Sequence, residues 1–108
     1  MIHGIVIRGT TPTHEFDLPY PIEIIQSLRI TYGQSRKPVH IKKLGEYGCE
    51  VTDGKLKVSL NQIETFAFNP SKHVFIEIRI KLNNGKVVRT EEPIVLKVVD
   101  TMDEEVMD

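Results

Sequence analysis

The 108-residue sequence carries 14 basic and 15 acidic side chains, a formal net charge of −1, and 40% of its residues are hydrophobic. This composition is typical of a globular domain, and a chain of this length is too short for two independent cores. No apolar run approaches the roughly 20 residues that a membrane span requires. The first residues, Met1 to Gly4, lack the basic start of a secretory signal, so we expect a chain that folds in the cytoplasm without membrane insertion.

The acidic side chains are unevenly distributed. Five of them, Asp100, Asp103, Glu104, Glu105 and Asp108, fall in the last nine residues. We therefore expect a single domain over residues 1–99, followed by a mobile acidic tail over residues 100–108. The small positive excess left on the domain does not by itself indicate a nucleic-acid footprint, and we do not expect nucleic acid as the main partner.

Residues that bind metals or act as nucleophiles are few and scattered. Cys49 is the only cysteine, so neither an internal disulfide nor a thiolate metal cluster is possible, and we expect a partly buried structural thiol. The four histidines, His3, His14, His40 and His73, show no spacing typical of a metal site. The sequence predicts no metal and no cofactor.

The alternation of apolar and polar side chains that is typical of half-buried strands begins near the N-terminus. We expect short strands at Ile2–Ile7 and His14–Leu18. Two prolines, Pro19 and Pro21, then favour a stiff extended crossing from Leu18 to Ile22 over a strand with ladder hydrogen bonds.

The same alternation predicts a hairpin further along the chain. A strand at Leu28–Tyr32 ends at Gly33, and a second strand at Val39–Ile41 follows the turn-prone residues 33–38. The two strands are expected to pair in antiparallel fashion.

Another hairpin is expected around Asp53-Gly54, because this dipeptide tolerates the positive φ angles of tight turns. It joins strands at Cys49–Val51 and Leu56–Leu60. Asn61 and Glu64 then have the spacing of a capping box, which predicts one short helical turn over residues 61–65. We expect Ile63, Phe66 and Phe68 to plug the core there.

The clearest strand is His73–Leu82, where Val74 and every second residue after it are apolar. Asn83-Asn84-Gly85 predicts a hairpin turn that leads into Lys86–Thr90, and a last strand is expected at Ile94–Val99. These elements together predict an all-β protein, an antiparallel immunoglobulin-like β-sandwich of about seven to nine short strands.

Charged residues offer two candidate surfaces, each with a simpler explanation. A weak basic patch on the predicted hairpin comprises Arg36, Lys37, His40, Lys42 and Lys43, near Tyr32 and Tyr47, and this mixture suits single-stranded nucleic acid. Lysines on an exposed hairpin also prevent edge-to-edge pairing, which is the interpretation we prefer. We interpret Arg79 and Lys81 beside Glu77 as a self-compensating surface ladder.

No acid/base pair suggests catalysis. Glu15 and Asp17 share one strand face, but period-two patterning alone predicts polar residues there. No glycine-rich phosphate loop, nucleophile elbow or zinc-binding helix is present in the sequence. We do not expect an enzyme.

Three stretches, Arg8–Pro19, Leu28–Tyr32 and Ser59–Thr65, resemble small proteins encoded in phage and prophage structural-gene regions. The layout of strands and turns also resembles the N-terminal β-sandwich domain of the phage baseplate upper protein. This resemblance implies a tail or baseplate accessory module that is made in the bacterial cytoplasm and assembled into the virion. Its implied partners are other phage structural proteins and further copies of itself.

On this interpretation the protein works through its surface. The candidate contacts are three aromatic side chains and one loop, namely Tyr20, Tyr32, Tyr47, Thr10, Thr11 and Pro12. A carbohydrate-binding module is one alternative, although Trp is absent and aromatics are only 6% of the residues. A nucleic-acid-binding module that uses the hairpin patch is the other.

Overall fold

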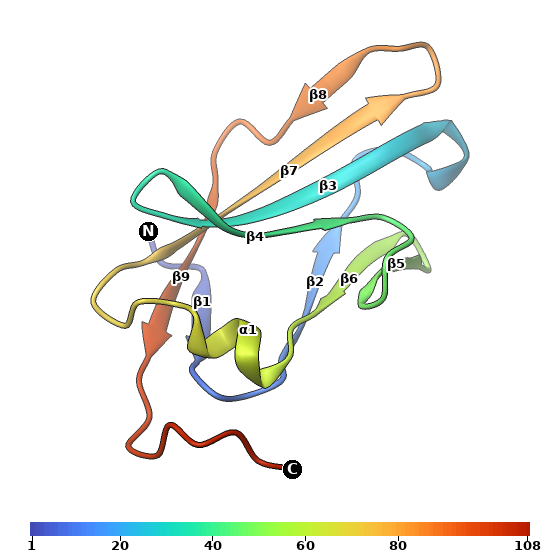
Figure 1. The fold of residues 1–108 in the computed structure, drawn as a ribbon. Coiled ribbons are helices and arrows are strands. Elements are labelled where there is room, and N and C mark those ends of the chain that lie inside the picture. The colour runs from blue at the N-terminus through green and yellow to red at the C-terminus, as the bar shows by residue number, and fades with distance from the viewer.

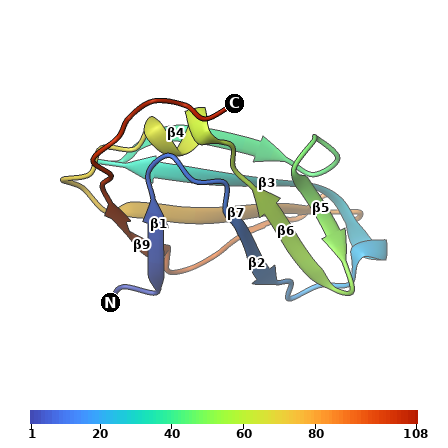
Figure 2. The ribbon, with the colours of Figure 1, turned by 90° about the horizontal axis from the view of Figure 1, so that it is seen from below.

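The computed structural model describes residues 1–108 and contains two β-sheets with the hydrophobic core between them (Figures 1 and 2). The large sheet has the order β1-β9-β7-β3-β4, with β8 paired to β7, and the small sheet has the order β2-β6-β5. The strands are β1 Gly4–Ile7, β2 Thr13–Asp17, β3 Ile25–Gln34, β4 Lys37–Lys43, β5 Cys49–Thr52, β6 Lys55–Ser59, β7 Val74–Leu82, β8 Val87–Arg89 and β9 Ile94–Val99. The predicted all-β sandwich of up to nine strands is confirmed.

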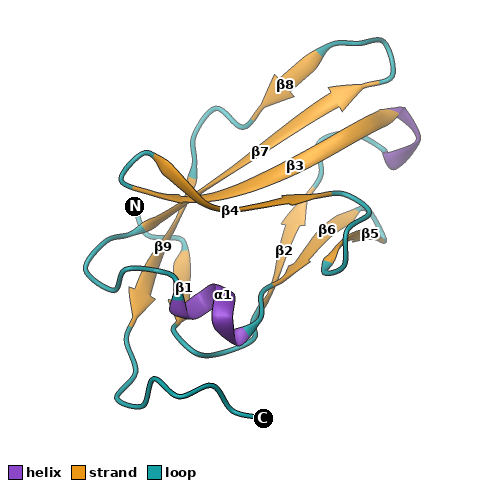
Figure 3. Cartoon of the chain, in the orientation of Figure 1, coloured by secondary structure: helices purple, strands orange, loops and turns teal.

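Strand pairing divides the nine strands between the two sheets. Strands 2, 6 and 5 form one sheet and strands 9, 7, 3 and 4 form the other, while β1 runs parallel to β9 at the edge. All other strand pairs are antiparallel. Strands dominate the chain, and helices occupy only two short segments (Figure 3).

Strands β3 and β7 form the centre of the large sheet. Every second residue of β7 from Val74 to Leu82 is buried, as the alternation predicts, and the intervening side chains face outward. Opposite them, Leu28, Ile30 and Tyr32 of β3 enter the same core. This register gives the large sheet one apolar face against the small sheet and one outer face.

The β3–β4 hairpin differs from the prediction. The strand does not end at Gly33 but continues to Gln34, and a two-residue turn at Ser35 and Arg36, both with positive φ, leads into β4. The register shifts between the pairs Tyr32/His40 and Gly33/Pro38, so Val39 is an extra residue in a bulge. A bulge changes which side chains face inward, and Ile41 consequently lies on the outer face.

The predicted helical turn is present as α1, Gln62–Phe66. Its capping box is complete: Asn61 Oδ1 accepts from the Glu64 N–H at 2.8 Å, and Glu64 Oε1 accepts from the Asn61 N–H at 2.9 Å. The expectation that Ile63 plugs the core is wrong, because one turn has too few residues to turn every apolar side chain inward and Ile63 is 70% exposed. Phe68 is buried in the core, as predicted, and Phe66 is half-buried.

The crossing after β2 has no ladder partner, as the prolines predict, and it ends in a 3₁₀ turn, Ile22–Ile24. Residues 100–108 form neither helix nor strand, and Figure 1 shows them running past α1. No helix in the structure has the length and apolar character needed to cross a membrane.

Candidate functional site

Four cations lie in one row across the outer face of the large sheet. Lys43 of β4 is the cross-strand partner of Arg29 of β3, Arg29 is the partner of Arg79 of β7, and Arg79 is the partner of Arg89 of β8. Cross-strand partners point to the same face of a sheet, and neighbouring strands are about 4.8 Å apart. The four side chains therefore form a continuous line of positive charge, which we call the cation row.

Little negative charge compensates the cation row. Arg89 pairs with Glu77 at 3.0 Å, but Arg29, Arg79 and Lys43 form no ion pair. The predicted self-compensating ladder of β7 is therefore wrong. Glu77 reaches across to β8, and neither Arg79 nor Lys81 has an acidic partner.

The position of the cation row within the sheet shows whether protection of a sheet edge can explain it. Lysines that protect an exposed edge belong on edge strands such as β4. Arg29 and Arg79, however, lie on β3 and β7, each of which has a strand on both sides. Like charges placed directly opposite each other destabilise a sheet, so edge protection does not account for these two arginines.

The surface around the cation row is hollowed and partly apolar. Two adjoining hollows, of about 500 and 770 Å³, are lined by residues of β3, β4, β7 and β8. Their charged residues are seven cations and one carboxylate: Arg29, Arg36, Lys37, Lys43, Arg79, Lys81, Arg89 and Glu77. Three apolar side chains in the same lining, Ile41, Phe75 and Val87, are 43–56% exposed. We call this outer surface the basic face.

The structure divides the basic patch that the sequence predicts. Arg36, Lys37 and Lys43 line the basic face, whereas His40 and Lys42 lie on the other side of β4 against α1. His40 Nε2 lies 2.7 Å from the Glu64 carbonyl oxygen, and Lys42 Nζ lies 2.8 Å from Glu64 Oε2. His40 and Lys42 therefore stabilise the contact between β4 and α1.

Glu64 combines these contacts with its capping role. Burial raises its pKa, but hydrogen bonds from Lys42 and from the Asn61 backbone N–H outweigh burial, and the net pKa is lowered. The carboxylate therefore stays ionised and holds β4 against α1.

The three candidate tyrosines lie in different environments. Tyr32 is fully buried and is thus a core residue, not a partner contact. Tyr20 is half-buried and packs against the core, while Tyr47 is fully exposed. None of the three tyrosines lines the basic face.

Tyr32 pairs with a histidine inside the sandwich. Its hydroxyl lies 2.8 Å from His14 Nδ1, while His14 Nε2 is buried without a hydrogen-bond partner. Burial lowers the pKa of His14 and raises the pKa of Tyr32, so both groups are neutral near pH 7. Cys49 is also fully buried, and burial raises the pKa of its thiol.

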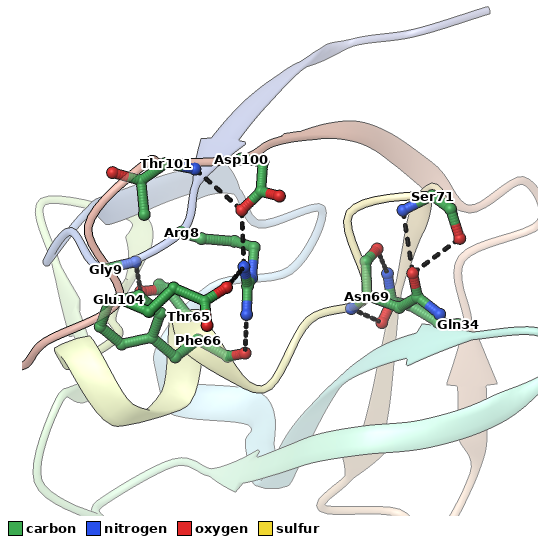
Figure 4. A network of polar contacts seen from close by, with 10 residues as sticks. All are labelled: Arg8, Gly9, Gln34, Thr65, Phe66, Asn69, Ser71, Asp100, Thr101 and Glu104. Atoms are coloured by element: carbon green, nitrogen blue, oxygen red, sulfur yellow. Dashed lines mark hydrogen bonds and ion pairs between the residues drawn. The ribbon is translucent and has the colours of Figure 1, made fainter.

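The loop with Thr10, Thr11 and Pro12 is tied to α1. Thr65 Oγ1 accepts from the Gly9 N–H at 2.9 Å (Figure 4). It also donates to the Thr10 carbonyl oxygen at 2.9 Å. The Leu60 N–H donates to the Pro12 carbonyl oxygen at 3.0 Å, while the Thr11 side chain is exposed. Residues 8–19 and 59–65, which are distant in the sequence, therefore pack together.

Arg8 ties the C-terminal residues to the same corner. Its Nη1 donates to Asp100 at 2.6 Å and to Glu104 at 2.9 Å, and its Nη2 donates to the Phe66 carbonyl oxygen at 3.1 Å (Figure 4). The guanidinium also lies over the Phe66 ring, 5.5 Å from its centroid. In this structure the acidic tail lies against the domain.

Gln34 fixes the neighbouring loop between α1 and β7. Its side chain accepts from the Asn69 N–H at 2.8 Å and donates to the Asn69 carbonyl oxygen at 2.9 Å and the Lys72 carbonyl oxygen at 3.0 Å. Asn69 in turn accepts from Ser71 (Figure 4). These are structural contacts that leave the basic face free.

Sequence reasoning did not find Arg29 or Arg89 and assigned Arg79 to a compensated ladder. Alternation indicates that Arg29 and Arg79 point outward, but the pairing of strands distant in sequence places them opposite each other. The useful signal would have been the recurrence of a cation on the outward face of each predicted strand.

The chemistry of the basic face suits anions, because arginine binds carboxylates and phosphates through two parallel hydrogen bonds. No group of three or more His, Cys, Asp or Glu side chains is placed to hold a metal ion. Comparisons with protein-family models, with curated proteins and with solved structures found no match.

Proposed function

We propose that this protein is a non-enzymatic component of a phage or prophage virion, a tail or baseplate accessory module that works through protein–protein contacts. The virion assignment is supported by the resemblance of Arg8–Pro19, Leu28–Tyr32 and Ser59–Thr65 to phage structural-region proteins. In such a role the chain is made in the bacterial cytoplasm and joins the particle during assembly.

The observation that carries the protein-contact part of the proposal is the uncompensated cation row on two inner strands. A sheet keeps such a row at a cost in stability, which a bound acidic partner offsets. Arginine and aromatic side chains are enriched in protein interfaces, and Phe75 beside Arg29 and Arg79 has this composition.

The proposal that the protein is not an enzyme is supported by the location of the side chains with shifted pKa values. His14, Tyr32 and Cys49 have pKa values shifted by burial within the core, away from the hollows of the basic face. Glu64 is occupied by its cap and by Lys42. None of these side chains lines the basic face.

The test is to tag the chain in its native host, induce the resident prophage and purify intact particles by sedimentation. Mass spectrometry is expected to recover the chain at a fixed ratio to the tail proteins. A tagged host protein of similar size is the control for carry-over. Recovery of the chain only in the soluble fraction would contradict the virion assignment.

Nucleic-acid binding is the second candidate, because the cation row also suits phosphates. Its affinity for a labelled oligonucleotide would fall steeply as the salt concentration rises. Fluorescence anisotropy at low salt measures this directly, with an Arg29→Gln/Arg79→Gln variant as the control. An unchanged anisotropy would remove this candidate.

A further inference from the structure

Positive and negative charge are segregated in this molecule. The basic face carries seven cations against one carboxylate, although the whole chain has a net charge of −1. The rest of the chain is therefore strongly acidic, and five of its acids lie within residues 100–108. A single chain thus offers two surfaces of opposite charge.

Contacts with the domain hold the acidic tail in one place. Arg8 binds Asp100 and Glu104, and Gln62 forms two hydrogen bonds of 2.8 Å with the backbone N–H and carbonyl oxygen of Met107. These contacts hold both ends of the segment. Figure 1 shows the segment running past α1, and Figure 4 shows the contacts of Arg8. The tail is therefore a surface with a defined position.

The side chains that these contacts leave free have a mixed composition. Three carboxylates form no ion pair, and three apolar side chains are 49% exposed or more: Asp103, Glu105, Asp108, Met102, Val106 and Met107. We call these six residues the acidic end. The basic face has the complementary composition, with cations around the exposed Ile41, Phe75 and Val87.

We propose that the acidic end of one copy of this chain docks on the basic face of a second copy. Carboxylates of the acidic end pair with the cation row, and its apolar side chains cover the exposed Phe75 and Ile41. The contact uses charges that remain free when Arg8 and Gln62 hold the tail.

Such a contact joins two different surfaces. Each copy in a pair still has one unused basic face or acidic end, so further copies can add in the same way. Contacts of this type produce rings when the rotation closes and filaments when it does not. The inference deepens the proposed function, because it names a second copy as one of the protein partners.

The features of the basic face favour a protein over a nucleic acid as its occupant. Single strands bind through several aromatic side chains on which bases stack, and Phe75 is the one aromatic side chain in the lining of the hollows. Exposed Ile41 and Val87 are suited to apolar partner atoms and gain nothing from a phosphate backbone.

The test uses two full-length variants that each remove one surface. The face variant is Arg29→Gln/Arg79→Gln and the end variant is Asp103→Asn/Glu105→Gln. Neutral replacements are chosen because reversed charges on both surfaces would create a new complementary pair. Neither variant changes Arg8 or Gln62, and circular dichroism with thermal melts checks that both are folded.

Sedimentation velocity at about 50 mM salt, where exposed charges are weakly screened, measures association from micromolar to millimolar protein. We expect the wild-type sedimentation coefficient to rise with concentration. Each variant alone is expected to associate about tenfold more weakly or not at all. In an equimolar mixture, the face variant still has an intact acidic end and the end variant still has an intact basic face. These two surfaces can form one contact, so the mixture is expected to form a dimer and nothing larger.

Three outcomes would overturn the inference: a wild-type chain that stays monomeric, an end variant that associates like the wild type, or a mixture without dimers. The basic face is a nucleic-acid surface if two results occur together: the face variant alone loses affinity for a labelled oligonucleotide, and the end variant self-associates like the wild type. All these measurements use purified protein, so their failure leaves the particle experiment as an independent test of virion membership.

Discussion

Arg29 and Arg79 lie directly opposite each other on the neighbouring strands β3 and β7, and neither has an acidic partner. Two cations in this position repel each other, and Lys43, which also forms no ion pair, extends the repulsion to β4. The large sheet therefore combines a well-buried inner face with an outer face that lowers the stability of the fold.

Replacing one of these arginines is expected to stabilise the protein. Arg79→Thr removes one of the two central charges of the row and introduces a residue that favours strands, so the free energy of unfolding should rise by about 0.5 kcal/mol. Urea denaturation measures the change. Added salt should stabilise the wild type more than the variant, because salt screens the repulsion that the variant lacks.

Lys81→Thr is the matched control for this variant. Lys81 lies on the same strand and face, but its cross-strand partners are Ser27 and Val87. It faces no opposing cation, so its replacement should leave the salt dependence unchanged. Equal effects of the two substitutions would show that the row carries no special repulsion.

Thr65 is expected to be essential to the corner between α1 and the Gly9 loop. Its hydroxyl serves the Gly9 N–H and the Thr10 carbonyl oxygen, and its side chain is fully buried. Thr65→Val keeps the shape but leaves those groups without a partner, which should cost about 1–3 kcal/mol in the free energy of unfolding. Thr52→Val, at an exposed strand position, is the control and should change stability little. A loss below about 0.5 kcal/mol for Thr65→Val would contradict this account.

The pH dependence of stability should reflect His14. Burial lowers its pKa in the folded state below the unfolded value of about 6.5, so the unfolded chain binds a proton more readily. Stability is therefore complete above about pH 6.5 and falls as the pH drops through the folded pKa. Urea midpoints between about pH 7.5 and 5 measure this loss.

His14→Gln separates this histidine from the other titrating groups. Glutamine can still bond the Tyr32 hydroxyl, but it does not titrate, so the variant should lose less stability over the same range. Carboxylates such as Glu64, whose pKa is lowered, add their own loss at lower pH in both proteins. Parallel profiles for the wild type and the variant would rule out His14 as the cause.

The β3–β4 turn is expected to be a site of strain that can be relieved. Ser35 and Arg36 both adopt positive φ, 53° and 63°, in a two-residue hairpin turn that favours Asn-Gly. Ser35→Asn/Arg36→Gly should raise the free energy of unfolding by about 1 kcal/mol, as seen in thermal melts.

Gly54→Ala tests the effect of positive φ by introducing strain, where the previous variant removes it. Gly54 has a φ of +74° in the Asp53-Gly54 turn, and a Cβ there would meet no atom within 4 Å. Only backbone strain can therefore destabilise the variant, by about 1 kcal/mol. If neither turn responds, positive φ is not the source of strain in these hairpins.

The sequence alone determined the features that depend on neighbouring residues. Alternation over β7 identifies which of its side chains are buried, Asp53-Gly54 identifies a hairpin, and Asn61 with Glu64 identifies the capped turn. Each of these signals acts over a few residues, because side-chain direction along a strand and capping at a helix end are local properties. Together they were sufficient for the all-β sandwich.

Only the tertiary structure decided what the charged residues do. The bulge at Val39 turns Lys42 toward Glu64 and Ile41 outward, and the pairing of β3 with β7 sets Arg29 against Arg79. Register between distant strands depends on the packing of the whole core, and a shift of one residue moves a side chain to the other face. For this reason the sequence contained every cation of the basic face and could not show that they form one surface.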